Sequence, residues 1–110
     1  MKEIIDFKDF LKLDIRIGLI SKAQYIENSD KLLLLSVDVG EEDERQLVAG
    51  IGKSYDPEEL KGKMVSVLVN LEPKKIMGYE SQGMVMAADG ENGPVVLSPQ
   101  KKVSVGSIVS

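Results

Sequence analysis

The chain has 110 residues, with 14 Lys and Arg against 18 Asp and Glu, and it contains no His, Cys or Trp. This length fits one globular domain, and the absence of Cys and His excludes disulfides, thiolate nucleophiles, Cys-ligated metals and the commonest general base. The net charge of −4 argues against coating nucleic acid by bulk electrostatics. Residues 1–60 balance to −6 and residues 61–110 to +2, so an anionic partner is expected to meet the second half.

A short helix is expected in the N-terminal segment, residues 1–12. Phe7, Phe10 and Leu11 follow the helical i, i+3, i+4 spacing, and Asp6 precedes them as an N-cap candidate. We expect this helix to pack its apolar side inward. The acidic residues at this end do not fit a signal peptide, and no apolar run approaches the roughly 20 residues of a membrane-spanning helix. A cytoplasmic protein without a membrane partner is therefore expected.

Alternating apolar residues predict the strands of a small sheet. Gly18 lies inside the first strand and permits a bulge or tight bend, as small barrels require at their corners. A turn is expected at 27–30, and the acidic stretch 41–44 is expected to form a hairpin loop because it is too charged to bury. The predicted strands cover residues 13–20, 32–40, 45–50 and 63–71.

A second short helix is predicted between the third and fourth strands. Asp56 is its N-cap, Pro57 its first residue, and Glu59 completes a carboxylate version of a capping box before Gly62 ends the helix. Five or so strands with one helix at this place is the element order of the OB-fold, a partly open Greek-key barrel. The predicted class is therefore all-β: one OB-fold domain over residues 1–110 with short helices.

The rest of the chain is expected to be loop and short extended pieces. Pro73, Gly78 and Gly83 punctuate a loop before the apolar run 84–88. Short extended pieces are expected at 95–97 and 103–109, within a C-terminal extension that covers residues 95–110.

One segment carries a family resemblance. Residues 70–88 read NLEPKKIMGYESQGMVMAA, and three further matches occur in order: DIRIG at 14–18, DKL at 30–32 and QLVAGI at 46–51. Together they resemble the tRNA-binding domains found with methionyl-tRNA synthetase and in the endothelial-monocyte-activating-polypeptide-like proteins. The resemblance covers nearly the whole chain and independently favours the OB-fold.

The resemblance implies a function without catalysis. Free-standing members of this family are homodimers that recognise the shape of the tRNA outer corner, and appended copies give a synthetase extra tRNA affinity. The chain is accordingly expected to bind tRNA without a cofactor, as a methionyl-tRNA synthetase beta subunit or a free-standing homologue. A homodimer is expected through residues 95–110 and the N-terminal helix, and a synthetase catalytic chain is an expected partner.

Proteins recognise RNA outside its helices with cationic and polar side chains and with backbone that lies close to the RNA. Lysines meet phosphates, amide and hydroxyl groups read base edges and 2′-hydroxyls, and a methionine offers a polarizable contact. The first choices for RNA contact, carried over from matching family positions, are Lys31, Ser81 and Met84. The next candidates are Asn70, Lys74, Lys75, Gln82 and Arg16.

Several candidates also have a structural interpretation. Arg16 can pair with Asp14 or Asp38, and this interpretation is slightly favoured. Asn70 can hold the following loop through its backbone. Met84 and Met86 alternate on a predicted strand, so one or both can fill the core.

Two features of the segment 70–88 are unfavourable for a site at which RNA bases stack on aromatic side chains. Glu72 replaces the neutral or basic residue of many family members, and Tyr79 is the segment's single aromatic residue. Recognition of RNA shape is therefore favoured over extensive base stacking.

Two other functions remain open from the sequence. Some relatives with the same dimeric fold are associated with protein export and bind unfolded peptides, so an export-chaperone-like peptide-binding dimer is the alternative. Carboxylate chemistry by the 41–44 stretch is disfavoured, because these residues lie in a solvated loop without convincing paired spacing.

Overall fold

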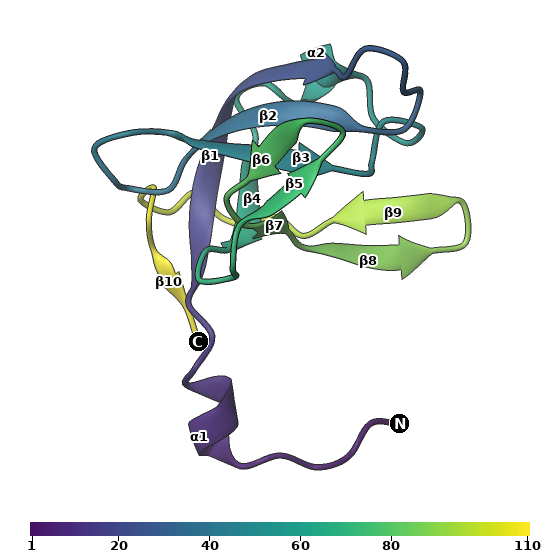
Figure 1. The fold of residues 1–110 in the computed structure, drawn as a ribbon. Helices are drawn as coiled ribbons and strands as arrows, with labels where there is room; N and C mark the ends of the chain where they lie inside the picture. The colour runs from purple at the N-terminus through teal and green to yellow at the C-terminus, as the bar shows by residue number, and fades with distance from the viewer.

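The computed structural model describes residues 1–110 and consists mainly of antiparallel strands wrapped into a small barrel (Figure 1). The barrel strands are β1 (Ile15–Tyr25), β2 (Leu33–Asp38), β3 (Arg45–Ala49), β4 (Met64–Leu68) and β7 (Met84–Val85). Their spatial order is β3-β2-β1-β4-β7, so β4 pairs with the edge of β1 that β2 leaves free. This order confirms the predicted all-β, five-stranded OB-fold.

The remaining elements lie around this barrel. One hairpin pairs β5 with β6, a second pairs β8 with β9, and β10 pairs with the start of β1. Figure 1 shows the first hairpin in front of the barrel and the second projecting from it. The bounds are α1 (Phe7–Phe10), α2 (Pro57–Leu60), β5 (Lys74–Ile76), β6 (Tyr79–Ser81), β8 (Ala87–Gly90), β9 (Gly93–Val96) and β10 (Ile108–Val109).

The long strand β1 turns the sheet into a barrel by pairing with β4 along its first half and with β2 along its second. Its register with β2 shifts between Ile20 and Lys22, which marks a β-bulge. The bulge therefore lies after Gly18, not at it. A Cβ at Gly18 would come within 2.6 Å of the Val37 Cγ1, so this glycine permits close packing of β1 on β2.

The core is one cluster of 13 buried residues. On β2 the side chains of Leu33, Leu35 and Val37 have no exposed surface, whereas the residues between them are partly exposed. The alternation predicted from the sequence is thus the real division between core and surface. Each buried aliphatic side chain of this size contributes about 1.5–3 kcal/mol to folding.

The predicted helix α2 has the capping box expected from its sequence. The Asp56 carboxylate accepts a hydrogen bond from the Glu58 amide at 3.0 Å, and the Glu59 carboxylate accepts one from the Asp56 amide at 2.7 Å. Leu60 is fully buried and attaches the helix to the barrel. The helix ends at Leu60, before the glycine that was expected to stop it.

The N-terminal helix α1 forms where it was predicted, but the prediction that it packs inward is wrong. Phe7 is 71% exposed and Leu11 63% exposed, and the helix has no buried residue. Asp6 makes no side-chain cap bond. The four-residue helix lies below the barrel in Figure 1. The rings of Phe7 and Phe10 stack on each other with their centroids 6.1 Å apart. No helix of the structure has the length and apolar character needed to cross a membrane.

The segment predicted to be a loop, which Pro73, Gly78 and Gly83 punctuate, contains the β5–β6 hairpin instead. Its two turn residues, Met77 and Gly78, have φ angles of 49° and 86°. Positive φ at both central positions is the type I′ geometry that fits the twist of a two-stranded hairpin. Such turns usually carry Asn-Gly or Asp-Gly, so the Met-Gly pair concealed this hairpin.

Two strand boundaries also differ from the predictions. β1 begins at Ile15 and continues to Tyr25, because its second half pairs with β2 beyond the bulge. In the 103–109 piece only Ile108 and Val109 form a strand, although Gly106 and Ser107 also form backbone hydrogen bonds with Ile17 of β1.

Candidate nucleic-acid interface

The β5–β6 hairpin presents two different sides. Its register places Lys74 opposite Ser81 and Lys75 opposite Glu80. Because successive side chains of a strand point to opposite faces, Lys74 lies on the side of Ser81 and Lys75 on the side of Glu80. The two lysines therefore do not form one cationic pair. Both are exposed, and neither takes part in an ion pair.

Ser81 fastens this hairpin to β3. Its side chain is buried, with 5% of the residue exposed. The hydroxyl accepts a hydrogen bond from the Val48 amide at 3.0 Å and donates one to the Gly83 carbonyl at 3.0 Å. Ser81 therefore lies beneath the surface, and its hydroxyl both donates and accepts a hydrogen bond within the protein.

Gln82 continues the same connection one residue further. Its backbone amide donates to the Gln46 carbonyl at 2.8 Å, and its side-chain oxygen accepts from the Gln46 amide at 2.9 Å. The Gln46 side-chain amide in turn donates to the Glu80 carbonyl at 2.9 Å. Ser81 and Gln82 thus satisfy the edge amides of β3 that no barrel strand pairs, and they close the barrel on this side.

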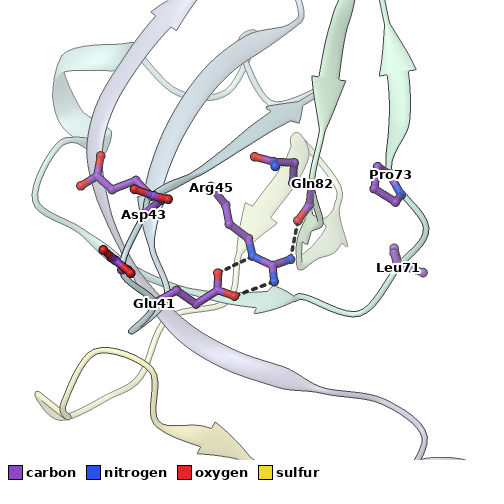
Figure 2. Close-up of a pocket in the computed structure, with 8 residues that line it drawn as sticks. Glu41, Asp43, Arg45, Leu71, Pro73 and Gln82 are labelled. Carbon is purple, nitrogen blue, oxygen red and sulfur yellow. Dashed lines mark hydrogen bonds and ion pairs between the residues drawn. The ribbon is translucent and has the colours of Figure 1, made fainter.

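Arg45 ties together the two ends of the segment from residue 70 to residue 82. Its Nη1 donates to the Val69 carbonyl at 2.7 Å and to the Gln82 carbonyl at 2.9 Å. The Glu41 carboxylate accepts two hydrogen bonds from the same guanidinium, at 2.7 and 3.0 Å (Figure 2). Arg45 is not among the residues predicted from the sequence, although an arginine four residues after a glutamate at the start of a strand is a signal for such an ion pair.

The side next to Arg45 is acidic. A depression of about 440 Å³ is lined by the four carboxylates of residues 41–44, with Leu71 and Pro73 on its other side (Figure 2). The hydrogen bond from Arg45 lowers the pKa of Glu41 below its ordinary value, so this carboxylate stays ionised to a more acidic pH than a free glutamate. Because these carboxylates repel phosphate, an RNA backbone is expected to approach the hairpin from elsewhere.

Asn70 and Arg16 hold the start of β1. The Asn70 side chain accepts from the Asp14 amide at 2.8 Å and donates to the Lys12 carbonyl at 2.6 Å. It therefore fixes the segment before β1 and not the loop that follows it. Arg16 donates to both oxygens of the Asp14 carboxylate at 2.9 and 3.1 Å, as its structural interpretation expected, and this lowers the pKa of Asp14.

Lys31 and Met84 are the exposed members of the first choices. Lys31 precedes β2, and a Cβ at Gly50 would lie 3.4 Å from its Cε, so the aliphatic part of the lysine passes over that glycine. Met84 is 47% exposed at the edge of β7, and neither it nor Met86 belongs to the buried core cluster. Exposed apolar groups also occur on the hairpin itself, where Met77 is 54% and Tyr79 37% exposed.

The eight candidates thus fall into two groups. Lys31, Lys74, Lys75 and Met84 are exposed side chains without an internal hydrogen bond or ion pair. The others use their polar groups inside the protein: Ser81, Gln82, Asn70 and Arg16. No group of three or more His, Cys, Asp or Glu side chains is arranged to hold a metal ion.

Comparison with known proteins relates the whole barrel to one family. The family model "Putative tRNA binding domain" matches residues 15–108. Methionine–tRNA ligase of Archaeoglobus fulgidus is 51% identical over 108 residues, which is 98% of this chain and 16% of that protein. The chain therefore spans about one sixth of the length of this relative.

Two solved structures have nearly the same architecture. The MetRS related protein from Pyrococcus horikoshii superposes with a TM-score of 0.91 at 41% identity, covering 99% of this chain and all of that one. The chaperone CsaA from Bacillus anthracis superposes with a TM-score of 0.88 at 32% identity, covering 98% of this chain and all of that one. Since the family model covers all five barrel strands and the hairpin that they carry, the chain belongs to the tRNA-binding domain family.

Proposed function

We propose that this chain is a non-catalytic tRNA-binding protein that recognises the folded shape of tRNA through the exposed lysines of the β5–β6 hairpin and the neighbouring barrel edge. The observation that carries the proposal is the contrast between polar groups and lysines within the segment from residue 70 to residue 84. The Ser81 hydroxyl and the Gln82 side-chain amide form hydrogen bonds that hold the hairpin on β3, whereas Lys74 and Lys75 are exposed. A rigid surface that presents mobile cations suits recognition by shape.

The exposed candidates would make the direct contacts. Lys31, Lys74 and Lys75 would meet phosphates as point charges. Met84, with Tyr79 from the hairpin, would supply flat or polarizable apolar contacts to exposed bases. Such contacts do not need a specific base, which agrees with recognition of a shape common to many tRNAs.

The remaining candidates would hold the RNA-contacting surface in place without touching RNA themselves. Ser81 and Gln82 hold β6 on β3, and Asn70 and Arg16 hold the start of β1. Loss of any of these bonds would loosen the surface without removing a contact to RNA. Arg45 would belong to the same group, because it joins both ends of the segment.

The synthetase is the proposed partner. The chain is 51% identical to methionine–tRNA ligases of two archaea, in which the matching part is about one sixth of the protein. A separate chain of this kind would increase tRNA capture by a methionyl-tRNA synthetase catalytic chain, or would act as a free-standing tRNA binder. Adding such a module raises affinity by supplying a second attachment to the same tRNA.

A homodimer through residues 95–110 and the N-terminal helix is also proposed. Phe10, Leu11, Leu13, Ile108 and Val109 line one depression of about 350 Å³. Leu11 and Ile108 are 63% and 70% exposed. An apolar patch of this kind at both chain termini is typical of a surface that a second copy covers.

Peptide binding is the second candidate function, favoured by the likeness to the chaperone CsaA. The two functions differ in their dependence on salt. Binding of tRNA through lysines should weaken steeply as salt rises, whereas apolar binding of an unfolded peptide should not.

A gel-shift titration tests the proposed function. Unmodified bulk tRNA and double-stranded DNA of similar length would be titrated with wild type, with Lys74→Ala/Lys75→Ala, and with Lys22→Ala/Lys61→Ala, in which two other exposed lysines are removed. The hairpin variant should lose tRNA affinity, and the control variant should retain it. Equal losses of tRNA and DNA binding would point to charge attraction alone, and tight peptide binding without tRNA binding would favour the alternative.

A further inference from the structure

A second cationic surface lies at the beginning of β4. A depression of about 290 Å³ is lined by Lys63, Lys101 and Lys102. The rest of its lining is Met64 and the loop from Ser98 to Gln100, so no carboxylate faces it. None of the three lysines takes part in an ion pair. In a chain with a net charge of −4, this is a local excess of positive charge.

The depression is separate from the hairpin surface. The Lys63 carbonyl accepts a hydrogen bond from the Ile20 amide at 3.0 Å, which fixes this end of β4 against the bulged part of β1. Asn70, the first residue of the segment 70–88 that carries the family resemblance, follows the opposite end of β4. Asn70 is seven positions after Lys63, which corresponds to about 23 Å of extended chain.

The loop from Ser98 to Lys102 belongs to the 95–110 segment of the proposed dimer, but it does not line the apolar patch at Ile108 and Val109 that a second copy would cover. β10 pairs with Ile15 and Arg16 at the start of β1, whereas Lys63 contacts β1 five residues later, at Ile20. A second copy on the apolar terminal patch would therefore leave the lysines free. The loop beside them offers a hydroxyl and an amide, from Ser98 and Gln100, as further donors to an anion.

We propose that this lysine depression is a second phosphate contact for the same tRNA that docks on the β5–β6 hairpin. The inference rests on the proposed function. An RNA ligand that spans both ends of β4 would meet the hairpin lysines at one end and the Lys63, Lys101 and Lys102 cluster at the other. Double-stranded RNA modules contact grooves over about 16 base pairs, so one folded RNA easily covers this separation. Two separated phosphate contacts would also fix the orientation of the tRNA on the barrel.

The salt dependence of tRNA binding tests this inference. Affinity for unmodified bulk tRNA would be measured from 50 to 300 mM salt for wild type, Lys101→Gln/Lys102→Gln, Lys63→Gln and the charge-matched control Lys22→Gln/Lys61→Gln. Each lost phosphate contact reduces the slope of log K against log salt by about 0.7 to 0.9. The double variant should therefore lose about 1.5 from the slope and about five- to tenfold in affinity at 100 mM salt. Lys63→Gln should lose about half as much slope.

The outcomes separate this inference from the proposed function. If Lys101→Gln/Lys102→Gln and Lys22→Gln/Lys61→Gln give the same slope, while Lys74→Ala/Lys75→Ala lowers it, the second contact is overturned and the proposed function stands. If wild type shows no salt-dependent tRNA binding, both fail. Sedimentation of each variant at the working concentration shows whether its oligomeric state is that of wild type. A change in that state confined to the double variant would place the lysines at the subunit contact and overturn the inference.

Discussion

The Arg45 guanidinium donates to the Gln82 carbonyl at 2.9 Å, and with this bond it joins the start of β3 to the residue that follows β6. The same nitrogen reaches the Val69 carbonyl at the end of β4. One side chain, 24% exposed and oriented by Glu41, therefore fixes both ends of the segment that carries the hairpin. The geometry of the segment from residue 70 to residue 82 therefore depends on Arg45, which lies outside that segment.

Replacing Arg45 should loosen the hairpin. Arg45→Ala leaves two carbonyls without a partner and should lower the free energy of unfolding by about 2 to 3 kcal/mol. Its tRNA affinity should fall roughly tenfold, because ordering a looser hairpin then costs about 1.4 kcal/mol of binding free energy. Arg45→Lys keeps the charge but not the planar fork, so it should restore only part of the loss. Urea denaturation and a tRNA titration measure the two effects. An unchanged salt slope is expected, since no phosphate contact is lost; a lower slope would mean that Arg45 touches RNA.

Removing the Ser81 hydroxyl should destabilise the barrel edge. Ser81→Ala leaves the buried Val48 amide without an acceptor, which should cost about 1 to 3 kcal/mol of stability. Ser54→Ala is the matched control, because that hydroxyl is exposed and makes no internal hydrogen bond. Hydrogen exchange should show faster exchange of the Val48 amide in the Ser81 variant only. Full stability together with lost tRNA affinity would instead assign the hydroxyl to direct RNA contact.

The ion pairs beside the hairpin should make stability depend on acid pH. Hydrogen bonds from Arg45 and Arg16 lower the pKa values of Glu41 and Asp14. A carboxyl whose pKa is lower in the folded chain stabilises it fully above the unfolded value, about 4, and loses this contribution as pH falls through the folded value. The free energy of unfolding should therefore decrease below about pH 4. Between pH 5 and pH 3 the free energy of unfolding of the Glu41→Gln variant should decrease less than that of wild type. The Glu42→Gln variant, which changes an exposed residue, should show the same decrease as wild type. Parallel curves for all three proteins would contradict the expectation.

Charging the terminal apolar patch should separate the proposed dimer. Ile108→Asp places a carboxylate on a side chain that is 70% exposed in the single chain, so folding should be little affected. Sedimentation at micromolar concentration should change from twice the mass of the 12.1 kDa chain to the single mass. Met77→Asp, at the exposed tip of the hairpin, should remain dimeric. A 12 kDa wild-type species under these conditions would refute the dimer.

Local sequence patterns were sufficient for most barrel elements. Alternation on β2 marked Leu33, Leu35 and Val37 as core, and the capping residues marked α2. These features depend on neighbours within a few residues, where periodicity and capping chemistry determine the structure. The family resemblance then indicated residues 70–88 as the segment that carries the candidate RNA contacts.

Contacts distant in sequence decided what the candidate residues do. Ser81 and Gln82 are polar residues in a glycine-punctuated segment, and nothing local shows that β3, more than 30 residues earlier, presents unpaired amides to them. Likewise, Phe7 and Leu11 have a helical apolar pattern, but only the completed barrel leaves that pattern exposed. The sequence by itself determined most of the barrel strands and the family, because both follow from local residue order. The tertiary structure alone decided which polar groups are consumed inside and which cations remain free, because hydrogen-bond partners far apart in the chain meet only after folding.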